Sequence, residues 1–288
     1  MPAPPETTPN PSSVFPPAMS PAAYRPPPSA SPSARTPSSS SSDNSRDHFH
    51  LPKLRLEVRD LSHAGASIFL SAIDITATFQ SAVRDVLHHL YTPSCSASGS
   101  PPPTRSVTLI LRPMPGVAYT TSTDLDEDHK EIHFSLSYIS QISPAARQAH
   151  EITGVLTHEL AHCYQFNAQD TCPGGLIEGI ADWVRLQCKL EPPHWNREAT
   201  GGWDDGYQHT AYFLDYLEER FGEGSVRRVN EKLRKQKYHE KPFWTELFGR
   251  PVEQLWDDYK EYLTNMNSTK TTSEKVNAET EPDAPLES

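Results

Sequence analysis

The chain has 288 residues, of which 35% are hydrophobic and 28 are prolines, and its formal net charge is −11. This acidic balance argues against non-specific binding to nucleic acid, and no apolar run approaches the roughly 18 residues of a membrane span. Residues 1–50 hold 13 prolines and 12 serines, which predicts a disordered tail. The polar residues 266–288 predict a second disordered tail, which leaves 51–265 as one folded domain.

The first part of this domain predicts strands around one helix. Residues 53–61 alternate apolar and charged side chains as a half-buried strand does, and 73–91 carry apolar residues at helical spacing. A surface loop, rich in proline and serine, covers 92–104, and 106–113 predict a buried strand. Residues 130–140 alternate again, which predicts a strand with one apolar and one polar face.

The second part of the domain is predicted to be helical. Five segments have apolar residues at helical spacing: 144–167, 176–190, 207–221, 243–249 and 251–263. Ser143 and Pro144 form a good start for the first of these helices, because a capping hydroxyl precedes a proline at the first helical position. Strands that come early and helices that come late indicate an α+β domain.

The sequence THELAH, residues 157–162, contains the pattern HExxH. Side chains four residues apart share a helix face, so His158 and His162 can point at one metal ion. Glu159 is rotated by about 100° and can reach a metal-bound water as a general base without ligating the metal. The alternative is a chance match, since the chain has 13 histidines.

A third ligand is predicted in GGLIEGIADWVRL, where Glu178 and Asp182 lie four residues apart on a helix. Two histidines and one glutamate are an established zinc ligand set with an open fourth position. A ligating histidine tends to donate its other N–H to a carboxylate, and Asp182 suits that role. The alternative is that Glu178, Asp182 and Arg185 form a solvated charge ladder, although the apolar neighbours of Glu178 argue against it.

Four segments together resemble the basic secretory protein family of plants, fungi and bacteria, a group of zincin-type metallopeptidases. They are EIHFSLSYIS, EITGVLTHELAHCYQFN, PGGLIEGIADWVRL and WDDGYQHTAYFLDYLEERFG, and they cover about residues 130–222. The resemblance implies a zincin-like α+β fold, with a small twisted sheet packed on the HExxH helix and a helical C-terminal lobe. It also implies that EIHFSLSYIS is the edge strand that pairs with extended substrate.

Carried over residue by residue, the resemblance implies zinc (Zn²⁺) ligation by His158, His162 and Glu178, with Asp182 behind them and Glu159 as the base. Tyr207, just after a glycine at a predicted helix start, is the preferred donor to the oxyanion, with packing as the alternative. The partner is then a peptide or protein substrate, and we expect a monomer.

The leading hypothesis is a zinc-dependent peptidase, expected to be an endopeptidase. The alternatives are a catalytically inactive zincin-fold module that binds a peptide or cell-wall ligand, and a metal-free structural protein. An intact Glu159 favours the enzyme, because a structural site needs no base. The N-terminus shows neither a basic nor an apolar signal region, so the cytoplasm is the default location, whereas the family resemblance leaves secretion open. Four cysteines without CxxC spacing are expected to be free thiols, with a Cys163–Cys172 disulfide as the alternative.

Overall fold

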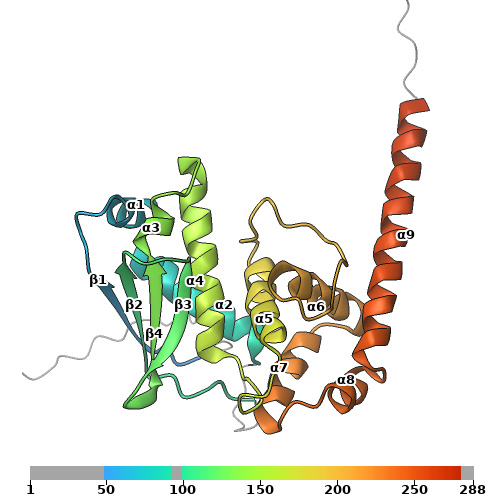
Figure 1. The fold of residues 1–288 in the computed structure, drawn as a ribbon, viewed down its shortest axis with the longest axis horizontal. Coiled ribbons are helices and arrows are strands. Elements are labelled where there is room, and N and C mark those ends of the chain that lie inside the picture. Colours follow the sequence, from blue (N-terminus) through green and yellow to red (C-terminus); the bar gives the residue numbers. More distant parts are fainter. Residues whose placement is uncertain (1–48, 93–98, 280–288) are drawn as a thin grey trace, which may run out of the picture. The chain divides into compact units, whose positions relative to one another are not determined.

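The computed structural model describes residues 49–92 and 99–279, with the last turns of the C-terminal helix described as backbone only. Within these residues the protein is an α+β fold with a four-stranded mixed sheet and nine α-helices (Figure 1). The tails predicted from the sequence therefore lie outside the described residues, except for 49–50 and 266–279.

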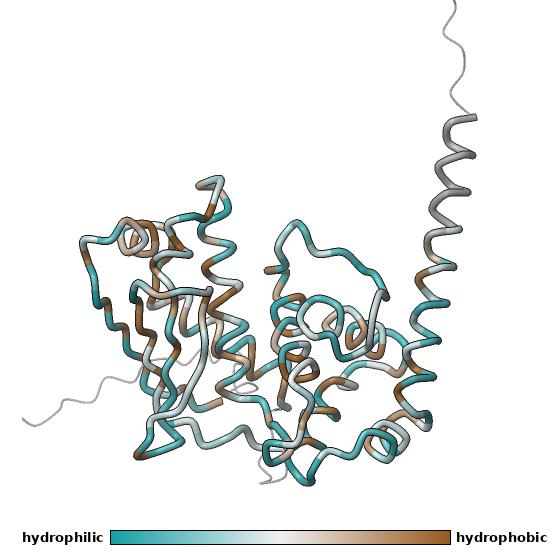
Figure 2. The backbone as a smooth tube through the Cα atoms, viewed as in Figure 1, coloured by the Kyte–Doolittle hydropathy of each residue, from teal (hydrophilic) through white to brown (hydrophobic). Residues whose placement is uncertain are grey.

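The sheet has the strand order β1-β2-β4-β3. Strands β1 (Lys53–Val58), β2 (Ser106–Arg112) and β4 (Asp126–Ser135) run parallel to one another, whereas β3 (Ala118–Thr123) pairs with β4 in the antiparallel direction. The first two strands were expected from the sequence, whereas β3 was not. The inner strand β2 is largely buried and carries a run of hydrophobic residues, which Figure 2 colours brown as it does the buried segments of the helices.

The strand predicted at 130–140 is shorter at its end, and its place in the sheet was predicted wrongly. β4 ends at Ser135, whose hydroxyl accepts a hydrogen bond from the backbone N–H of Tyr138 and caps the short helix α3 (Leu136–Ile139). β4 is an inner strand, so its last residues are buried on both faces, including His133. The edge strand beside it is β3, because the hairpin folds back onto the outer side of β4.

Two helices precede β2. Asp74 caps α2 (Ile75–Leu90) by accepting hydrogen bonds from two backbone N–H groups, and α2 buries its apolar face as predicted. Helix α1 (Ala64–Ala72), which begins after His63, was not predicted from the sequence. No single described helix is long and apolar enough to cross a membrane; α1 and α2 meet that test only when joined across their 71° bend, as buried core helices also can.

The HExxH helix, α4 (Gln148–Tyr164), starts later and ends earlier than the sequence predicts. Pro144 has extended backbone angles and is followed by a single 3₁₀ turn, so the predicted start at Ser143–Pro144 is wrong. Glu151 in the first turn of α4 complements the helix dipole there. The helix ends because Gln165 adopts an extended conformation. α4 packs against β3 and β4 on one side and against α5 on the other.

The remaining helices follow α4 in sequence. They are α5 (Gly174–Gln187), α6 (Tyr207–Phe221), α7 (Ser225–Lys235), α8 (Glu240–Phe248) and α9 (Val252–Glu279). Helix α7 was not predicted, and α9 continues past the domain boundary predicted at residue 265. A helix whose start is fixed by packing elongates at little cost, because nucleation is the unfavourable step. Buried aromatic rings on α6, α8 and α9 join these helices: Phe213, Trp244, Trp256 and Tyr259.

The cysteines in the described residues are free thiols. Cys163 is buried, and Cys172 and Cys188 are partly buried, with no disulfide among them. The expectation of free thiols is therefore confirmed for these three, and the Cys163–Cys172 alternative is wrong. Cys95 lies outside the described residues.

Candidate metal centre

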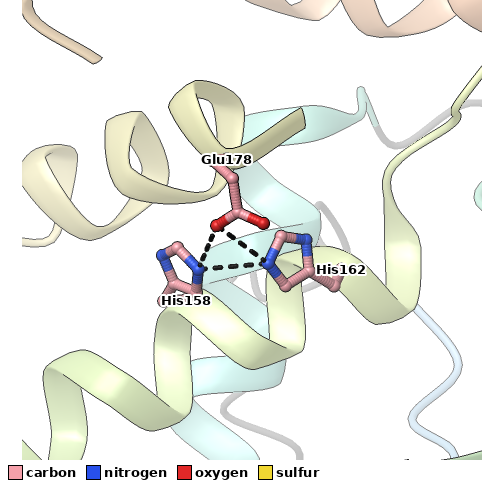
Figure 3. Close-up of side chains that lie close together, drawn as sticks. All are labelled: His158, His162 and Glu178. Carbon is pink, nitrogen blue, oxygen red and sulfur yellow. Dashed lines mark hydrogen bonds and ion pairs between the residues drawn. The ribbon is translucent and has the colours of Figure 1, made fainter. Parts of the chain in front are cut away.

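Helices α4 and α5 bring three ligand-type side chains to one point (Figure 3). The Nε2 atoms of His158 and His162 are 3.0 Å apart, as their spacing by one helical turn allows. An oxygen of Glu178, from α5, lies 3.2 Å from Nε2 of His158 and 3.7 Å from Nε2 of His162. Among the described residues these three form the group able to hold a metal ion.

A buried carboxylate fixes the orientation of His158. Asp182 is only 3% exposed, and its Oδ1 lies 2.6 Å from Nδ1 of His158. This contact requires a proton on Nδ1 and leaves Nε2 facing His162 and Glu178. Burial opposes the charged form of His158, but its hydrogen bonds to Asp182 and Glu178 outweigh burial and raise its pKa to about 10. The Asp182 carboxylate therefore holds the ring in the orientation that a metal ligand needs.

The position of Glu178 depends on close packing at the start of α5. A Cβ atom on Gly175 would lie 1.7 Å from the backbone oxygen of Asp204, so only glycine lets the loop before α6 approach α5 this closely. Burial alone would raise the pKa of Glu178, but hydrogen bonds from the two histidines lower it well below its usual range. Glu178 therefore faces the histidines as a carboxylate.

Gln165 supports the second histidine. Its side-chain amide lies 2.8 Å from Nδ1 of His162, at the point where α4 ends. With the amide oxygen turned toward the ring, Gln165 would accept the Nδ1–H of a neutral imidazole, and its otherwise unpaired buried oxygen would gain a partner. Both histidines thus have a polar partner behind them, as the sequence suggested for Asp182.

Glu159 is buried, with 5% of its surface exposed, and its side chain turns from the helix toward the sheet. The hydroxyl of Thr120 on β3 lies 2.6 Å from Oε2 of Glu159 and 3.0 Å from its backbone oxygen. Thr120 is not among the site residues predicted from the sequence, because β3 was not predicted. The run AYTTST, rich in β-branched residues, is the signal that could have located the strand, although not its neighbour.

Tyr207 lies at the first position of α6, next to the candidate metal-ligand group formed by His158, His162 and Glu178. Its ring is stacked over His158 with the ring centroids 6.4 Å apart, and 58% of its surface is exposed. Its backbone has a φ of 46°, in the left-handed region that is uncommon for a residue other than glycine, and follows Gly206. The negative charge of Glu178 and, to a lesser extent, burial raise the pKa of Tyr207, so its hydroxyl stays protonated and can act as a donor.

These side chains line a cleft of about 890 Å³ that follows α4. Arg185, on α5, also lines the cleft. It donates to Glu151 in the first turn of α4 at 3.1 Å and to the backbone oxygen of Leu190. Arg185 lies under the ring of Trp195 and is buried, as is Asp182, so the sequence alternative of a solvated charge ladder is wrong. These contacts fix one end of the loop between α5 and α6.

Comparison with protein-family models shows that the chain that forms this cleft is of the peptidase class. The family described as peptidase of plants and bacteria (BSP) matches residues 51–259. The chain belongs to this family, which confirms the resemblance to the basic secretory protein family. Comparisons with curated proteins and with solved structures gave no match.

Proposed function

We propose that this protein is a zinc-dependent peptidase of the HExxH type, with His158, His162 and Glu178 as zinc ligands and Glu159 as the general base. The observation that carries the proposal is the meeting of three ligand atoms from α4 and α5 beside Glu159 in one cleft. Membership of a peptidase family supports hydrolysis of peptide bonds as the reaction. The proposal includes a zincin-type fold, in which α4 lies between the sheet and the helical lobe.

The chemistry of the site fits a zinc ion. The three separations between ligand atoms are 3.0, 3.2 and 3.7 Å. Tetrahedral ligands with bonds of about 2.0–2.1 Å are about 3.3 Å apart, so little adjustment is needed. With its proton on Nδ1, a neutral His158 turns a lone pair toward a carboxylate and a second imidazole, which is unfavourable unless a positive charge, either a second proton on His158 or a metal ion, lies between them.

The residues around the ligands have the roles that peptide hydrolysis requires. A zinc ion, when bound there, would polarise the substrate carbonyl and acidify the attacking water. Glu159 would accept the proton of that water and deliver it to the leaving amine, so it changes protonation state twice in each cycle. The hydroxyl of Tyr207 would donate to the oxygen that becomes negative, since the Tyr207 ring is stacked over His158 and lines the same cleft.

The outer edge of β3 is proposed to bind the extended substrate backbone, in place of β4 as the sequence suggested. The backbone N–H of Ser135 donates to the backbone oxygen of Val117 at 2.9 Å. Every second residue from Val117 onward therefore directs its backbone N–H and C=O groups toward β4. The backbone groups of Ala118 and Thr120 therefore point outward, and both residues line the cleft. A substrate strand added there would lie along α4 and pass the ligand group.

Purified wild-type protein tests the proposal. We expect about one zinc per chain and cleavage of an unfolded protein substrate, which a chelator abolishes and added zinc restores. A bound zinc without cleavage would contradict the peptidase assignment and favour the inactive binding module. A protein that binds no zinc would contradict the metal site as well and favour the structural alternative.

Zinc affinity is expected to rise with pH. The raised pKa of His158, about 10, means that the metal-free folded protein holds a proton on this residue at neutral pH. This proton stabilises the metal-free fold below the unfolded pKa of about 6.5, and the stabilisation is lost as pH rises towards 10. Zinc must displace the proton, so its affinity should increase about tenfold per pH unit between pH 6.5 and 8.

Competition with a chelator at several pH values measures this slope. Calorimetry in buffers of different ionisation enthalpy counts the protons released and serves as the control for the chelator's own protonation. A zinc affinity that does not change with pH would show that His158 is already neutral in the metal-free protein.

A further inference from the structure

Thr120 makes a contact that the proposed mechanism does not use. It lies on the edge strand β3, and its hydroxyl reaches across to α4, 39 residues later in the chain, where it meets Glu159. The distance of 2.6 Å to Oε2 of Glu159 is typical of a hydroxyl that donates to a charged carboxylate. The backbone oxygen of the same glutamate lies 3.0 Å from the hydroxyl. Both acceptors near the Thr120 hydroxyl therefore belong to Glu159, and the single hydroxyl proton has the shorter distance to the carboxylate.

The Glu159 carboxylate has no other hydrogen-bond donor among the described residues. A carboxylate that is 5% exposed needs a partner, because removing it from water without one is costly. The contact engages Oε2 and leaves Oε1 without a partner from the described residues, on a side chain that lines the cleft. Thr120 thus selects which oxygen of the base is held by the protein and which is presented to the cleft.

The residue type at position 120 suits this role. Threonine is β-branched, so its side-chain rotation is restricted and the position of its hydroxyl is fixed by the strand. The hydroxyl does not lose its proton near neutral pH, so it stays a donor while the carboxylate changes state. The backbone of Thr120 also faces the open edge of the strand, so one residue borders both the proposed substrate strand and the base.

We propose that Thr120 is a positioning residue, which holds the carboxylate of Glu159 in the orientation that directs Oε1 toward the metal-ligand group. The catalytic consequence rests on the proposed function, whereas the contact between Thr120 and Glu159 is independent of it. Its prediction is specific: loss of the hydroxyl should lower the rate of the chemical step without loss of zinc and with little effect on substrate binding, because the edge of β3 is unchanged.

Thr120→Val, Thr120→Ser and the control Thr121→Val test this proposal with zinc-loaded protein and an unfolded protein substrate. Thr121 is the next residue of β3 and is exposed; among the described residues its hydroxyl hydrogen-bonds only to the backbone oxygen of Ser122, and its register partner is Glu131. We expect Thr120→Val to lower kcat about 10- to 100-fold with KM changed less than about twofold, since a hydrogen bond to a charged group is lost. Thr120→Ser should keep most of the wild-type kcat.

Melting temperatures of the metal-free protein provide a readout that does not depend on activity. They are measured in a double-mutant cycle of the wild type, Thr120→Val, Glu159→Ala and the variant that carries both substitutions. We expect the fall in melting temperature caused by Thr120→Val to be at least halved when Glu159 is already alanine, because no buried carboxylate then loses its donor.

The role of Thr120 would be overturned by a wild-type kcat in Thr120→Val, or by an equal fall in melting temperature with and without the Glu159 carboxylate. A loss of kcat in Thr121→Val as large as in Thr120→Val would do the same. If wild-type protein shows no chelator-sensitive cleavage, the proposed function fails, and the melting cycle alone then decides whether Thr120 holds Glu159.

Discussion

Replacement of Glu159 by alanine is expected to leave about one zinc per chain and to remove the peptidase activity. Glu159 is not one of the three converging ligands, so the metal site should survive its loss. It is the carboxylate beside that site on the same helix, and general base catalysis of this kind contributes about 10²- to 10⁴-fold to the rate. We therefore expect kcat/KM for a protein substrate to fall by about that factor, with zinc content measured on the same preparation.

Glu159→Gln is the matched control for the shape of the site. The amide can still accept the hydrogen bond of Thr120, but it cannot take a proton from water, so its activity should be as low as that of the alanine variant. Melting temperatures of both variants show whether lost activity reflects lost folding. Wild-type activity in either variant, with zinc bound, would remove Glu159 from the mechanism.

Replacement of Glu178 by glutamine is expected to weaken zinc binding by about 100-fold or more. Apparent free energies for zinc sites with four protein ligands are about 10–16 kcal/mol, which is about 3 kcal/mol for each ligand, or about two powers of ten. The glutamine side chain carries no charge, so it also lacks the attraction to the two histidines that holds the Glu178 carboxylate in place. Equilibrium dialysis or chelator competition measures the change, and cleavage should fall with zinc occupancy.

Glu223→Gln provides a control with the same change of charge. Glu223 is exposed in the turn between α6 and α7, so its substitution should leave zinc affinity and activity as in the wild type. Unchanged zinc affinity in Glu178→Gln would show that Glu178 is not a ligand. The proposed ligand set would then be wrong, even if the two histidines bind a metal.

The histidine pair and the carboxylate pair could be predicted from the sequence because each pair lies within one helix. Residues four apart on a helix share a face by local geometry alone, so His158 with His162 and Glu178 with Asp182 needed no knowledge of the fold. Helix ends were predicted less well. The start of α4 is set by the 3₁₀ turn after Pro144, and a capping pattern with proline does not distinguish this turn from the first turn of an α-helix.

The tertiary structure alone decided how these local pairs meet and which strand borders them. The distance between Glu178 and His158 depends on the packing of α4 against α5, which Gly175 and the loop before α6 permit. The order of the strands placed β3 at the edge and Thr120 against Glu159, although a pattern of alternating residues says nothing about which strands are neighbours. A repeat along the chain specifies which face a side chain occupies, whereas contacts between distant segments depend on how whole elements pack together.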